Sequence, residues 1–348
     1  MKRITLVITL FLFFMAFTMG ISAAQQNFVL VIHGGAGTIE KKYMTPEKER
    51  AYTQKLTEAL QAGYQALKDG KSSVDAVQAA INVMEDSPLF NAGKGAVFTH
   101  DGRNEMDASI MNGANLEAGA VADVSTIKNP IDAARAVMEQ SKHVMLACRG
   151  AEAFARKAGC TIVDTSYFYT RERWEQLLRA RAKDDGKKSA MRQIGPAKSM
   201  IYGAGEEDEK FGTVGCAALD KQGNLAAGTS TGGMTDKLYD RIGDSPIIGA
   251  GTYANNATCA ISCTGWGEYF MRTLASKTVS DLMEYKGMSL KEAADTVIMH
   301  IIPDLGGDGG LISVDKNGHI AMPFNTPGMF RGYIRSDGVA HVFMYRQQ

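Results

Sequence analysis

The sequence predicts a mixed α/β domain, built as a four-layer αββα sandwich in which two packed β-sheets lie between outer layers of helices. Three observations lead to this prediction. Apolar runs with the length of strands occur before residue 125 and again after residue 212, and stretches with helical periodicity separate them. Groups of strands that alternate with groups of helices along the chain favour sheets covered by helices. No internal repeat argues for an array, and one mixed domain of 348 residues is ordinary.

The first predicted elements are a strand and two helices. Residues 28–32 form a continuous apolar run that predicts a buried strand, which enters a predicted glycine-rich loop at 33–37. Threonine, proline and glutamate at 45–47 suit the N-cap and first turn of a helix that should reach about residue 69. Ser72 or Ser73 caps a second helix through Met84. One face of this helix is apolar, with Val74, Val77, Ala80, Ile81 and Met84. Both helices should cover a sheet.

The middle of the chain changes character twice. Glycine-punctuated strands are predicted at 105–111 and 116–124, and helical periodicity returns in several pieces between 130 and 182. The segment 181–209 is rich in charge, glycine and serine, which predicts a mobile, poorly packed connector reaching the strand that begins at 213. The elements predicted after it are strands at 213–219, 225–231 and 257–264, helices at 268–274, 280–285 and 290–301, and closing strands between 311 and 345.

Composition and the first residues indicate an exported globular protein. With 38 basic and 38 acidic residues the chain has no net charge, which argues against a nucleic-acid or anionic-membrane partner. Lys2 and Arg3 precede the apolar run 4–17, and small residues at 22–24 suit a signal peptidase, so 1–24 is predicted to be a signal peptide. An uncleaved anchor is the alternative. The mature protein is expected to be periplasmic or secreted.

The cysteines predict packing rather than metal binding. There is no Cys-x-x-Cys and no histidine pair at metal spacing. An odd number of cysteines in an oxidising compartment leaves at least one unpaired or bonded between chains. Most of the five are therefore predicted to be small core residues: Cys148, Cys160, Cys216, Cys259 and Cys263.

A threonine beside a glycine follows the predicted connector directly. Thr213 begins an apolar strand, and Gly212 precedes it. A threonine hydroxyl is a weak nucleophile at neutral pH unless a base lies next to it. Cleavage of the Gly212–Thr213 bond would free an α-amine with an ordinary pKa of about 7.7–8.0, which can act as that base. The alternative interpretation is a threonine that only starts a strand.

A second pair of residues suits a zwitterionic substrate. Arg241 and Asp244 stand three residues apart in a turn bounded by Gly243 and Pro246, so that both side chains can point into one cleft. The guanidinium of Arg241 can bind an α-carboxylate through two hydrogen bonds while Asp244 holds an α-ammonium. Taken alone, the pair could also be a surface salt bridge of little energetic value.

Several ordered sequence blocks resemble one known family. The blocks are His33-Gly-Gly-Ala-Gly37, Phe90-Asn-Ala-Gly-Lys-Gly95, Gly212-Thr-Val-Gly215, Thr229-Ser-Thr-Gly-Gly-Met234, Arg241-Ile-Gly-Asp-Ser-Pro246 and Cys263-Thr-Gly-Trp-Gly-Glu268. Together they resemble the plant-type L-asparaginase and isoaspartyl peptidase family of N-terminal nucleophile (Ntn) hydrolases, from Phe28 to the end of the chain. The resemblance implies an Ntn-type sandwich that cuts itself at Gly212–Thr213.

The resemblance also implies roles for individual residues. Thr213 is the expected nucleophile, Thr231 tunes its hydroxyl, and Asn91 helps to orient it. Thr264 and Gly265 are expected to donate a hydroxyl and a backbone N–H to the developing oxyanion. The residues expected to bind substrate are Arg241, Asp244, Thr264, Gly265 and Gly267. The segment from Met84 to Lys94 resembles a loop whose main-chain carbonyls hold a structural sodium ion, here those of Glu85, Ser87, Phe90 and Ala92.

Three other interpretations compete with this one. Gly228-x-Ser230-x-Gly232 fits an esterase motif, with Asp308 and His319 as partners, but no helix of useful length follows it as that motif requires. A glycosylasparaginase-like amidase shares the nucleophile and the substrate clamp, but Gly212 and Gly232-Gly233 favour the isoaspartyl peptidase branch. An exported amino-acid-binding protein without turnover would need no Thr213.

The sequence therefore predicts an autoprocessing hydrolase of two pieces. An α piece from Gln25 to Gly212 and a β piece from Thr213 to Gln348 are expected to pair, and the resemblance implies a dimer of such heterodimers. The expected substrates are β-aspartyl dipeptides and L-asparagine, through an acyl-enzyme on Thr213, without an organic cofactor. Trp266 replaces the smaller residue expected between two glycines and could reshape the leaving-group side.

Overall fold

A computed structural model of the protein describes residues 27–194 and 212–346, and the side chains of 184–194 are not described. The predicted signal peptide at 1–24 lies outside the described residues, as does the part of the predicted connector at 195–211. No helix within the described ranges combines the length and apolar character that a membrane span requires.

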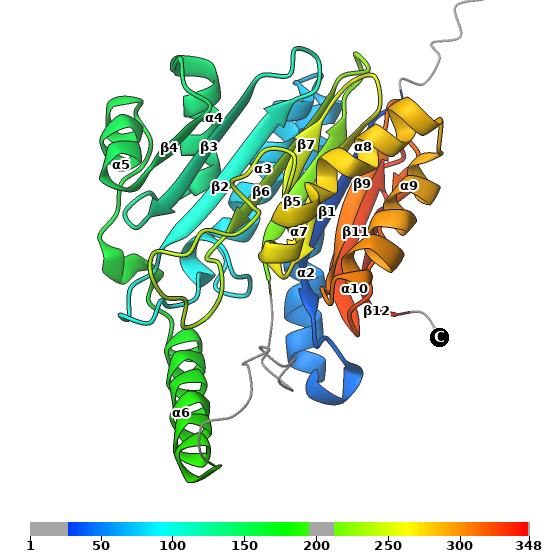
Figure 1. The fold of residues 1–348 in the computed structure, drawn as a ribbon. Coiled ribbons are helices and arrows are strands. Elements are labelled where there is room, and N and C mark those ends of the chain that lie inside the picture. Colours follow the sequence, from blue (N-terminus) through cyan, green and yellow to red (C-terminus); the bar gives the residue numbers. More distant parts are fainter. Residues whose placement is uncertain (1–26, 195–211, 347–348) are drawn as a thin grey trace, which may run out of the picture.

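Two β-sheets pack together between two layers of helices in the part of the chain that the structure describes (Figure 1). The strands are β1 (Val29–Gly37), β2 (Met106–Asn112), β3 (Ala118–Val124), β4 (Met145–Ala147), β5 (Val214–Leu219), β6 (Leu225–Thr231), β7 (Thr252–Ala254), β8 (Cys259–Gly265), β9 (Gly309–Asp315), β10 (Ile320–Ala321), β11 (Gly328–Arg335) and β12 (Ala340–Tyr345). Eight of them form one sheet in the order β12-β11-β1-β5-β6-β2-β3-β4, and four form the other in the order β10-β9-β8-β7.

Helices cover the outer face of each sheet. The α-helices of the described residues are α2 (Pro46–Lys68), α3 (Ser73–Glu85), α4 (Pro130–Gln140), α5 (Cys148–Lys157), α6 (Arg171–Ile194), α7 (Gly267–Thr273), α8 (Ala275–Lys286), α9 (Leu290–Thr296) and α10 (Ile302–Asp304), with a π-helical turn at Val297–Ile301 between the last two. Helices α2 to α5 pack on the larger sheet, and α8 and α9 pack on the smaller one. The predicted four-layer αββα sandwich is confirmed.

The two predicted helices after the first strand form for the expected reasons. The hydroxyl of Thr45 caps α2 by accepting a hydrogen bond from the N–H of Lys48, and Pro46 is its first residue. Ser72 and Asp75 make a reciprocal capping box at the start of α3. The apolar face predicted for α3 is buried against the larger sheet.

The glycine-rich stretch 33–37 is strand rather than loop, so that prediction was wrong. Strand β1 pairs with β11 as far as Gly37, and the register shifts between His33 and Gly35. Gly35 has a φ of +111°, and a Cβ there would lie 2.5 Å from the backbone nitrogen of Gly212. Glycine therefore lets the bulged strand pass directly against the predicted cleavage site.

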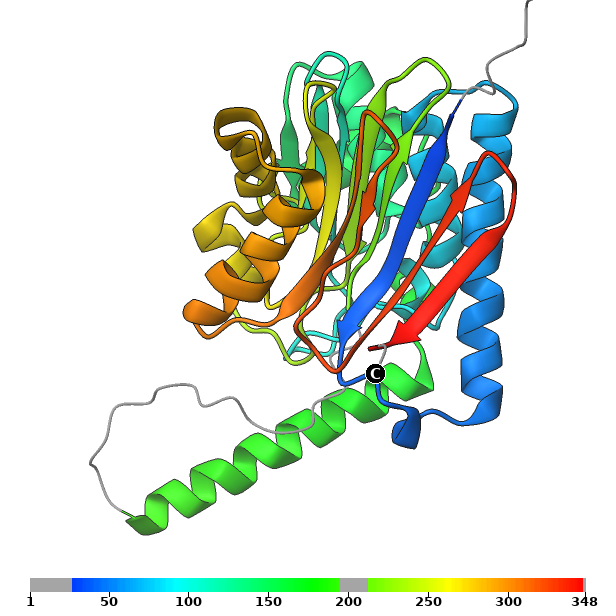
Figure 2. The ribbon, with the colours of Figure 1, turned by 90° about the vertical axis from the view of Figure 1, so that its right-hand side faces the viewer.

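The predicted connector also begins later than expected, because α6 continues to Ile194. Its second half mixes good helix formers, such as lysine, arginine and glutamine, with aspartate, glycine and serine, so a composition that suggested a mobile connector is also compatible with a helix. The first half is anchored, since Leu177 is buried and Arg173 Nε donates to the carbonyl oxygen of Gly95 at 2.8 Å. Figure 2 shows the helix projecting away from the sheets.

Two short strands were not predicted. Strands β4 and β7 have three residues each, too few to show an alternating pattern. The prediction for the cysteines holds for Cys216, Cys259 and Cys263, which are buried, whereas Cys148 is exposed.

Candidate active site

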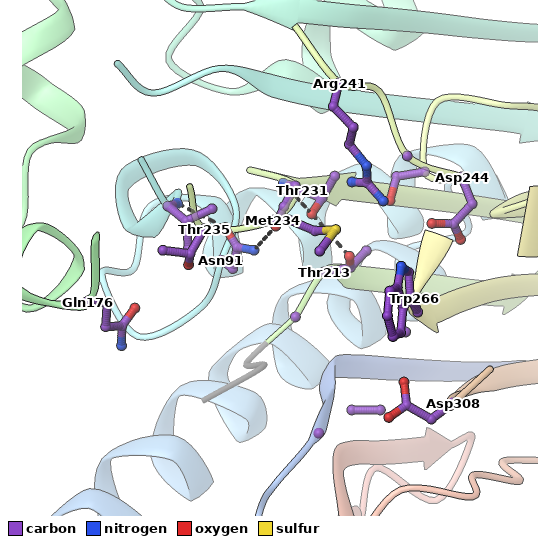
Figure 3. A pocket seen from close by; sticks show the side chains of 18 of the residues that line it. Asn91, Gln176, Thr213, Thr231, Met234, Thr235, Arg241, Asp244, Trp266 and Asp308 are labelled. Atoms are coloured by element: carbon purple, nitrogen blue, oxygen red, sulfur yellow. Dashed lines mark hydrogen bonds between the residues drawn. The ribbon is translucent and has the colours of Figure 1, made fainter. Parts of the chain in front are cut away.

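The predicted nucleophile lies at the start of β5, beside the end of β6. The hydroxyl of Thr213 donates a hydrogen bond to Thr231 Oγ1 at 3.0 Å, and both residues are buried. The backbone N–H of Gly233 also donates to Thr231 Oγ1, at 3.0 Å. Pairing of Val214 with Ser230 brings the two threonines together. The structure thus places Thr231 where it can fix the Thr213 hydroxyl (Figure 3).

Asn91 contacts Thr213 and Thr231 only indirectly, through the turn that follows β6. Its Nδ2 donates to the carbonyl oxygen of Gly233 at 2.7 Å, and its Oδ1 accepts from the N–H of Val97 at 3.0 Å. The N–H of Gly232 donates to the backbone oxygen of Asn91. Asn91 therefore holds the turn after β6, and that turn holds Thr231.

The hydroxyl of Thr264 lies against the residue before the nucleophile. A Cβ on Gly212 would be 2.9 Å from Thr264 Oγ1, so glycine is needed for this close approach. The N–H of Ala36 donates to the same oxygen at 3.3 Å. Because Thr264 accepts this bond, its own proton stays available for an oxyanion. Gly265 follows with a φ of +151° and lines the cavity beside Thr213.

His33 is a site residue that our sequence reasoning did not single out. Its Nδ1 donates to the carbonyl oxygen of Thr213 at 3.0 Å, which fixes the tautomer, because a carbonyl can only accept. Its Nε2 then accepts from Ser262 Oγ at 2.9 Å. Complete burial lowers the pKa of His33 to about 3, although the bond to Thr213 acts in the opposite direction. The neutral ring therefore holds the backbone of the nucleophile.

A chain of buried hydroxyls continues from His33 between the two sheets. It passes from Ser262 Oγ to Thr229 Oγ1 (2.7 Å), Thr252 Oγ1 (2.5 Å) and Ser109 Oγ (2.8 Å), which donates to the carbonyl oxygen of Ser245 at 2.6 Å. Ser245 follows Asp244 in the sequence. The chain thus joins the backbone of the nucleophile to the turn that carries the predicted clamp.

One cavity of about 460 Å³ brings most of the predicted residues together, although Thr264 and Gly267 do not line it. Thr213, Thr231, Asn91, Gly265, Arg241 and Asp244 all line it. Trp266 and Asp308 line it as well, together with Gln176, Arg179 and Lys183 from α6. The contribution of α6 was not predicted, because no motif marks it.

Asp244 presents a buried carboxylate to this cavity. Its Oδ2 has no hydrogen-bond partner among the described residues. Burial raises the pKa of Asp244 to about 7, the charge of Arg241 acts against this shift, and the charges of Glu268 and Asp107 add to it. A Cβ on Gly267 would lie 2.8 Å from Asp244 Oδ1, so Gly267 leaves the room that the carboxylate occupies. The ammonium group of a ligand could donate the hydrogen bond that Oδ2 lacks.

Arg241 is held by a residue to which the sequence assigned no role. Its Nε and Nη2 donate to the two carboxylate oxygens of Glu268 at 2.9 and 2.8 Å. Burial opposes ionisation of Glu268, but the bonds and charge of Arg241 outweigh it and lower its pKa. One edge of the guanidinium is thus bound by Glu268, and no hydrogen bond from a described residue occupies Nη1, which can bind a ligand. Glu268 is the last residue of the sequence block 263–268, but nothing in the sequence indicates that its side chain contacts Arg241.

The loop after α3 offers backbone oxygens for a small cation. No described residue donates a hydrogen bond to the carbonyl oxygens of Glu85 or Phe90. Cβ atoms on Gly93 and Gly95 would clash with these two oxygens, at 2.3 and 2.0 Å. Within the described residues no cluster of His, Cys, Asp or Glu side chains could hold a metal ion. The loop therefore fits a cation that binds carbonyl oxygens.

The residues of the rejected esterase motif do not assemble. Ser230 donates to Glu85 Oε1 at 2.6 Å, on the other face of β6 from the nucleophile. His319 contacts Asp315 rather than Asp308.

Comparison with known proteins places the chain in one family. The profile of a family described as Asparaginase matches residues 26–344. An isoaspartyl peptidase from Salmonella typhimurium is 49% identical over 319 residues, covering 92% of this chain and 99% of that protein. An isoaspartyl peptidase from Escherichia coli is 48% identical over 320 residues, covering 92% and 97%. A plant-type L-asparaginase from Pyrococcus abyssi is 41% identical over 308 residues, covering 88% and 96%.

Proposed function

The chain belongs to the plant-type asparaginase and isoaspartyl peptidase family of N-terminal nucleophile hydrolases, and on this basis we propose that it cleaves β-aspartyl dipeptides and L-asparagine. The observation that carries the proposal is that Arg241 and Asp244, whose Oδ2 has no hydrogen-bond partner among the described residues, line the same cavity as Thr213. These groups suit the α-carboxylate and α-ammonium that both substrates carry, with the side-chain amide at the nucleophile.

The reaction follows from the residues around Thr213. Its Oγ attacks the side-chain carbonyl carbon, and the proton passes to the freed α-amine. Thr264 and Gly265 would stabilise the oxyanion, at ~3–4 kcal/mol for each donor. The C–N bond then breaks, and the leaving amine takes the proton. Water attacks the resulting ester, releases L-aspartate and restores the Thr213 hydroxyl.

We propose that the same hydroxyl first cuts its own chain. Thr213 Oγ attacks the carbonyl carbon of Gly212, the peptide nitrogen leaves as the α-amine, and water hydrolyses the ester to free the Gly212 carboxylate. The position of Thr264 supports this step, because a Cβ built on Gly212 would lie 2.9 Å from Thr264 Oγ1, so that the expected oxyanion donor lies beside the scissile residue.

A denaturing gel tests this proposal. Purified protein kept at neutral pH should give two bands, from residues 25–212 and 213–348, and should release L-aspartate from L-asparagine and from β-aspartyl-leucine. Thr213→Ala should give one uncut band and no hydrolysis. A single band that persists in an active wild-type preparation would contradict self-cleavage. A processed protein inactive on both substrates would contradict the proposed function.

The rival functions are less well supported. A glycosylasparaginase-like amidase would use the same clamp, but the relatives named above are isoaspartyl peptidases and an asparaginase. A binding protein without turnover would not need Thr213 and Thr231 within hydrogen-bonding distance.

We also propose a structural sodium ion in the loop after α3. The carbonyl oxygens of Glu85, Ser87, Phe90 and Ala92 would hold it. The dipoles of these carbonyl groups would stabilise its charge, and the ion would take no part in the reaction. Thermal unfolding in sodium chloride should then occur at a higher temperature than in choline chloride of equal ionic strength.

Export and assembly remain proposals based on sequence. The pattern at 1–24 supports cleavage before Gln25 and release into the periplasm or medium. Sequencing the N-terminus of the exported protein tests this cleavage. The family resemblance supports a dimer of heterodimers, which light scattering of the processed protein would detect.

A further inference from the structure

A second pocket, of about 430 Å³, is lined by residues other than those of the candidate active site. Helix α9, the π-helical turn after it, the segment between β10 and β11, strand β11 and the residue after β12 all contribute to it. It shares no lining residue with the cavity of Thr213. Two arginines line it, Arg331 and Arg346. A ligand bound here would therefore leave the active-site cavity free.

Arg331 carries a buried charge that no carboxylate of the described residues pairs with. The residue is 7% exposed. Its Nη1 donates to the carbonyl oxygen of Met329 at 3.0 Å, and the bonds to the carbonyl oxygen of Tyr345 are longer, at 3.4 and 3.5 Å. Burial lowers the pKa of Arg331 to about 10, so the guanidinium stays charged at neutral pH. A buried charge is costly unless an opposite charge offsets it, and an anionic ligand would supply that charge.

Arg346 brings a second guanidinium to the same pocket. The guanidinium carbons of Arg331 and Arg346 lie 4.6 and 5.8 Å from the centroid of the Phe324 ring, so both cations are next to one aromatic side chain. Arg346 is exposed, and its Nη2 donates to the carbonyl oxygen of Thr326 at 3.3 Å. Because a guanidinium has five N–H groups, both arginines retain donors that no described residue uses. The two can therefore bind one anion together.

The acidic residue of the pocket does not neutralise this pair of arginines. Asp295 lines the pocket, but it forms an ion pair with Lys291, one turn earlier in α9. Among the described residues that line the pocket there is no other carboxylate. His300 also lines it and adds ring nitrogens rather than a negative charge. The pocket therefore has an excess of positive charge, which suits an anion.

The rest of the lining is apolar and indicates which kind of anion fits. Met299, Met322, Pro323 and Phe324 supply this surface. A hydrated inorganic ion gains nothing from apolar side chains, whereas an organic anion can bury its apolar part against them. A carboxylate also matches the planar guanidinium through two parallel hydrogen bonds. The lining thus favours a carboxylate attached to an apolar group.

We propose that the pocket of Arg331 and Arg346 is a second binding site, for a carboxylate with an apolar body such as an aromatic ring. The segment between β10 and β11 contributes Phe324 to this pocket and Thr326 to the cavity of Thr213. A bound carboxylate would therefore rest on a segment that also lines the active-site cavity. This inference goes beyond the proposed hydrolysis and does not depend on it.

A fluorine NMR titration of the purified protein with 4-fluorobenzoate tests this site. We expect the wild type to bind 4-fluorobenzoate with a Kd of about 1 mM or lower. The neutral analogue 4-fluorobenzamide should bind at least about tenfold more weakly, because it carries no charge for the arginines. Arg331→Gln and Arg346→Gln should each weaken the binding of 4-fluorobenzoate by about tenfold. Circular dichroism shows whether each variant is folded, and the exposed position of Arg346 keeps the test valid if Arg331→Gln does not fold.

Two arginines outside the pocket provide matched controls. Arg335 lies on the same strand as Arg331, donates to the carbonyl oxygen of Gly318 and lies over the ring of Tyr333, but it does not line the pocket. Arg335→Gln should bind 4-fluorobenzoate as the wild type does. Arg241→Gln removes the cation expected to bind a substrate carboxylate and should also leave this binding unchanged.

Four results would overturn the second site. The wild type could fail to bind 4-fluorobenzoate, or it could bind the neutral amide equally well. The folded Arg331→Gln and Arg346→Gln variants could keep the affinity of the wild type while Arg241→Gln loses it, which would place the ligand in the active-site cavity. Displacement of 4-fluorobenzoate by an equal concentration of inorganic phosphate would show that the pocket takes small inorganic anions rather than an apolar carboxylate.

Discussion

At the scale of single residues, the candidate site depends on buried polar groups with few partners. The Oδ2 atom of Asp244 has none among the described residues, and His33 is fully buried between a carbonyl and a hydroxyl. Such groups cost stability unless they are satisfied. Asp244 can gain its missing hydrogen-bond partner from a ligand, whereas both ring nitrogens of His33 already have partners in the folded chain. Ionisation of Asp244 should therefore affect ligand binding, and ionisation of His33 should affect folding.

The affinity for L-aspartate, the expected product, should depend on the ionisation of Asp244. With a pKa of about 7, Asp244 is largely protonated at pH 5.5 and holds an ammonium poorly. The Kd of the processed protein should fall by roughly tenfold per pH unit up to pH 7 and then level off. Calorimetric titration between pH 5.5 and 8.5 measures it. Asp244→Asn should bind weakly, with little change over this range, and an equally steep dependence in that variant would exclude Asp244 as the cause.

Two amide replacements of His33 should separate its contacts. In His33→Asn, the amide nitrogen of the new side chain can lie near the position of the imidazole Nδ1 and still donate to the oxygen of Thr213. The longer side chain in His33→Gln reaches toward Ser262 and leaves Thr213 without a donor. We expect His33→Gln to slow self-cleavage at least about tenfold and His33→Asn to slow it less, since a lost buried hydrogen bond costs ~1–3 kcal/mol. Band intensities over time give both rates. Equal rates in the two variants would mean that the bond to Thr213 does not position the nucleophile.

At the scale of elements, the clamp is assembled by helix α7 and the turn before β7. Glu268 lies in the first turn of α7 and binds one edge of Arg241, while Gly267 leaves space for Asp244. Without Glu268, the guanidinium would be drawn to the carboxylate of Asp244, because opposite charges attract strongly where water is excluded. The helix thus keeps apart the two charges that a zwitterion must bind separately.

Glu268→Ala should therefore weaken substrate binding without affecting self-cleavage. We expect the KM for L-asparagine to rise about tenfold, with a smaller change in kcat, because Arg241 would then pair with Asp244 and neither group would be available to the substrate. Cleavage at Gly212–Thr213 requires no substrate carboxylate and should proceed at the wild-type rate, which also shows that the variant folds. Glu284→Ala, at an exposed position of α8, is the matched control. An unchanged KM in Glu268→Ala would exclude this role.

At the scale of the whole molecule, sequence predicted the layers and the site better than the contacts between them. Caps and periodicity located α2 and α3, and ordered blocks brought Thr213, Thr231 and Arg241 into one site. The glycines at 33–37 were misjudged because a bulged strand and a loop share the same composition. The pairs His33–Ser262 and Arg241–Glu268 are 229 and 27 residues apart in sequence, and single-sequence patterns carry no information on such distances. For the same reason, the sequence did not predict that residues of α6 line the cavity of Thr213.

The buried histidine should also make the whole fold sensitive to acid. The pKa of His33 is about 3 in the folded protein and 6.5 as its ordinary value, so between these values the unfolded chain binds more protons. The contribution of His33 to stability is present above pH 6.5 and is lost as the pH falls toward 3. Between pH 7 and pH 4 the expected loss is about 3 kcal/mol. Asp244 and Glu85 have raised pKa values and act in the opposite direction, so the parent protein alone does not isolate this effect.

Comparison of Thr213→Ala with the double variant Thr213→Ala/His33→Asn isolates the contribution of His33 to the pH dependence of stability. Both chains should stay uncut, which allows reversible urea unfolding, and asparagine does not titrate. The free energy of unfolding of the single variant should fall relative to that of the double variant as the pH is lowered from 7 to 4. Parallel pH profiles would show that His33 takes up its proton in the folded state, contrary to a neutral ring that donates to the backbone of Thr213. A fall of the single variant relative to the double variant would mean that the imidazole that aligns the nucleophile also limits the acid stability of the sandwich.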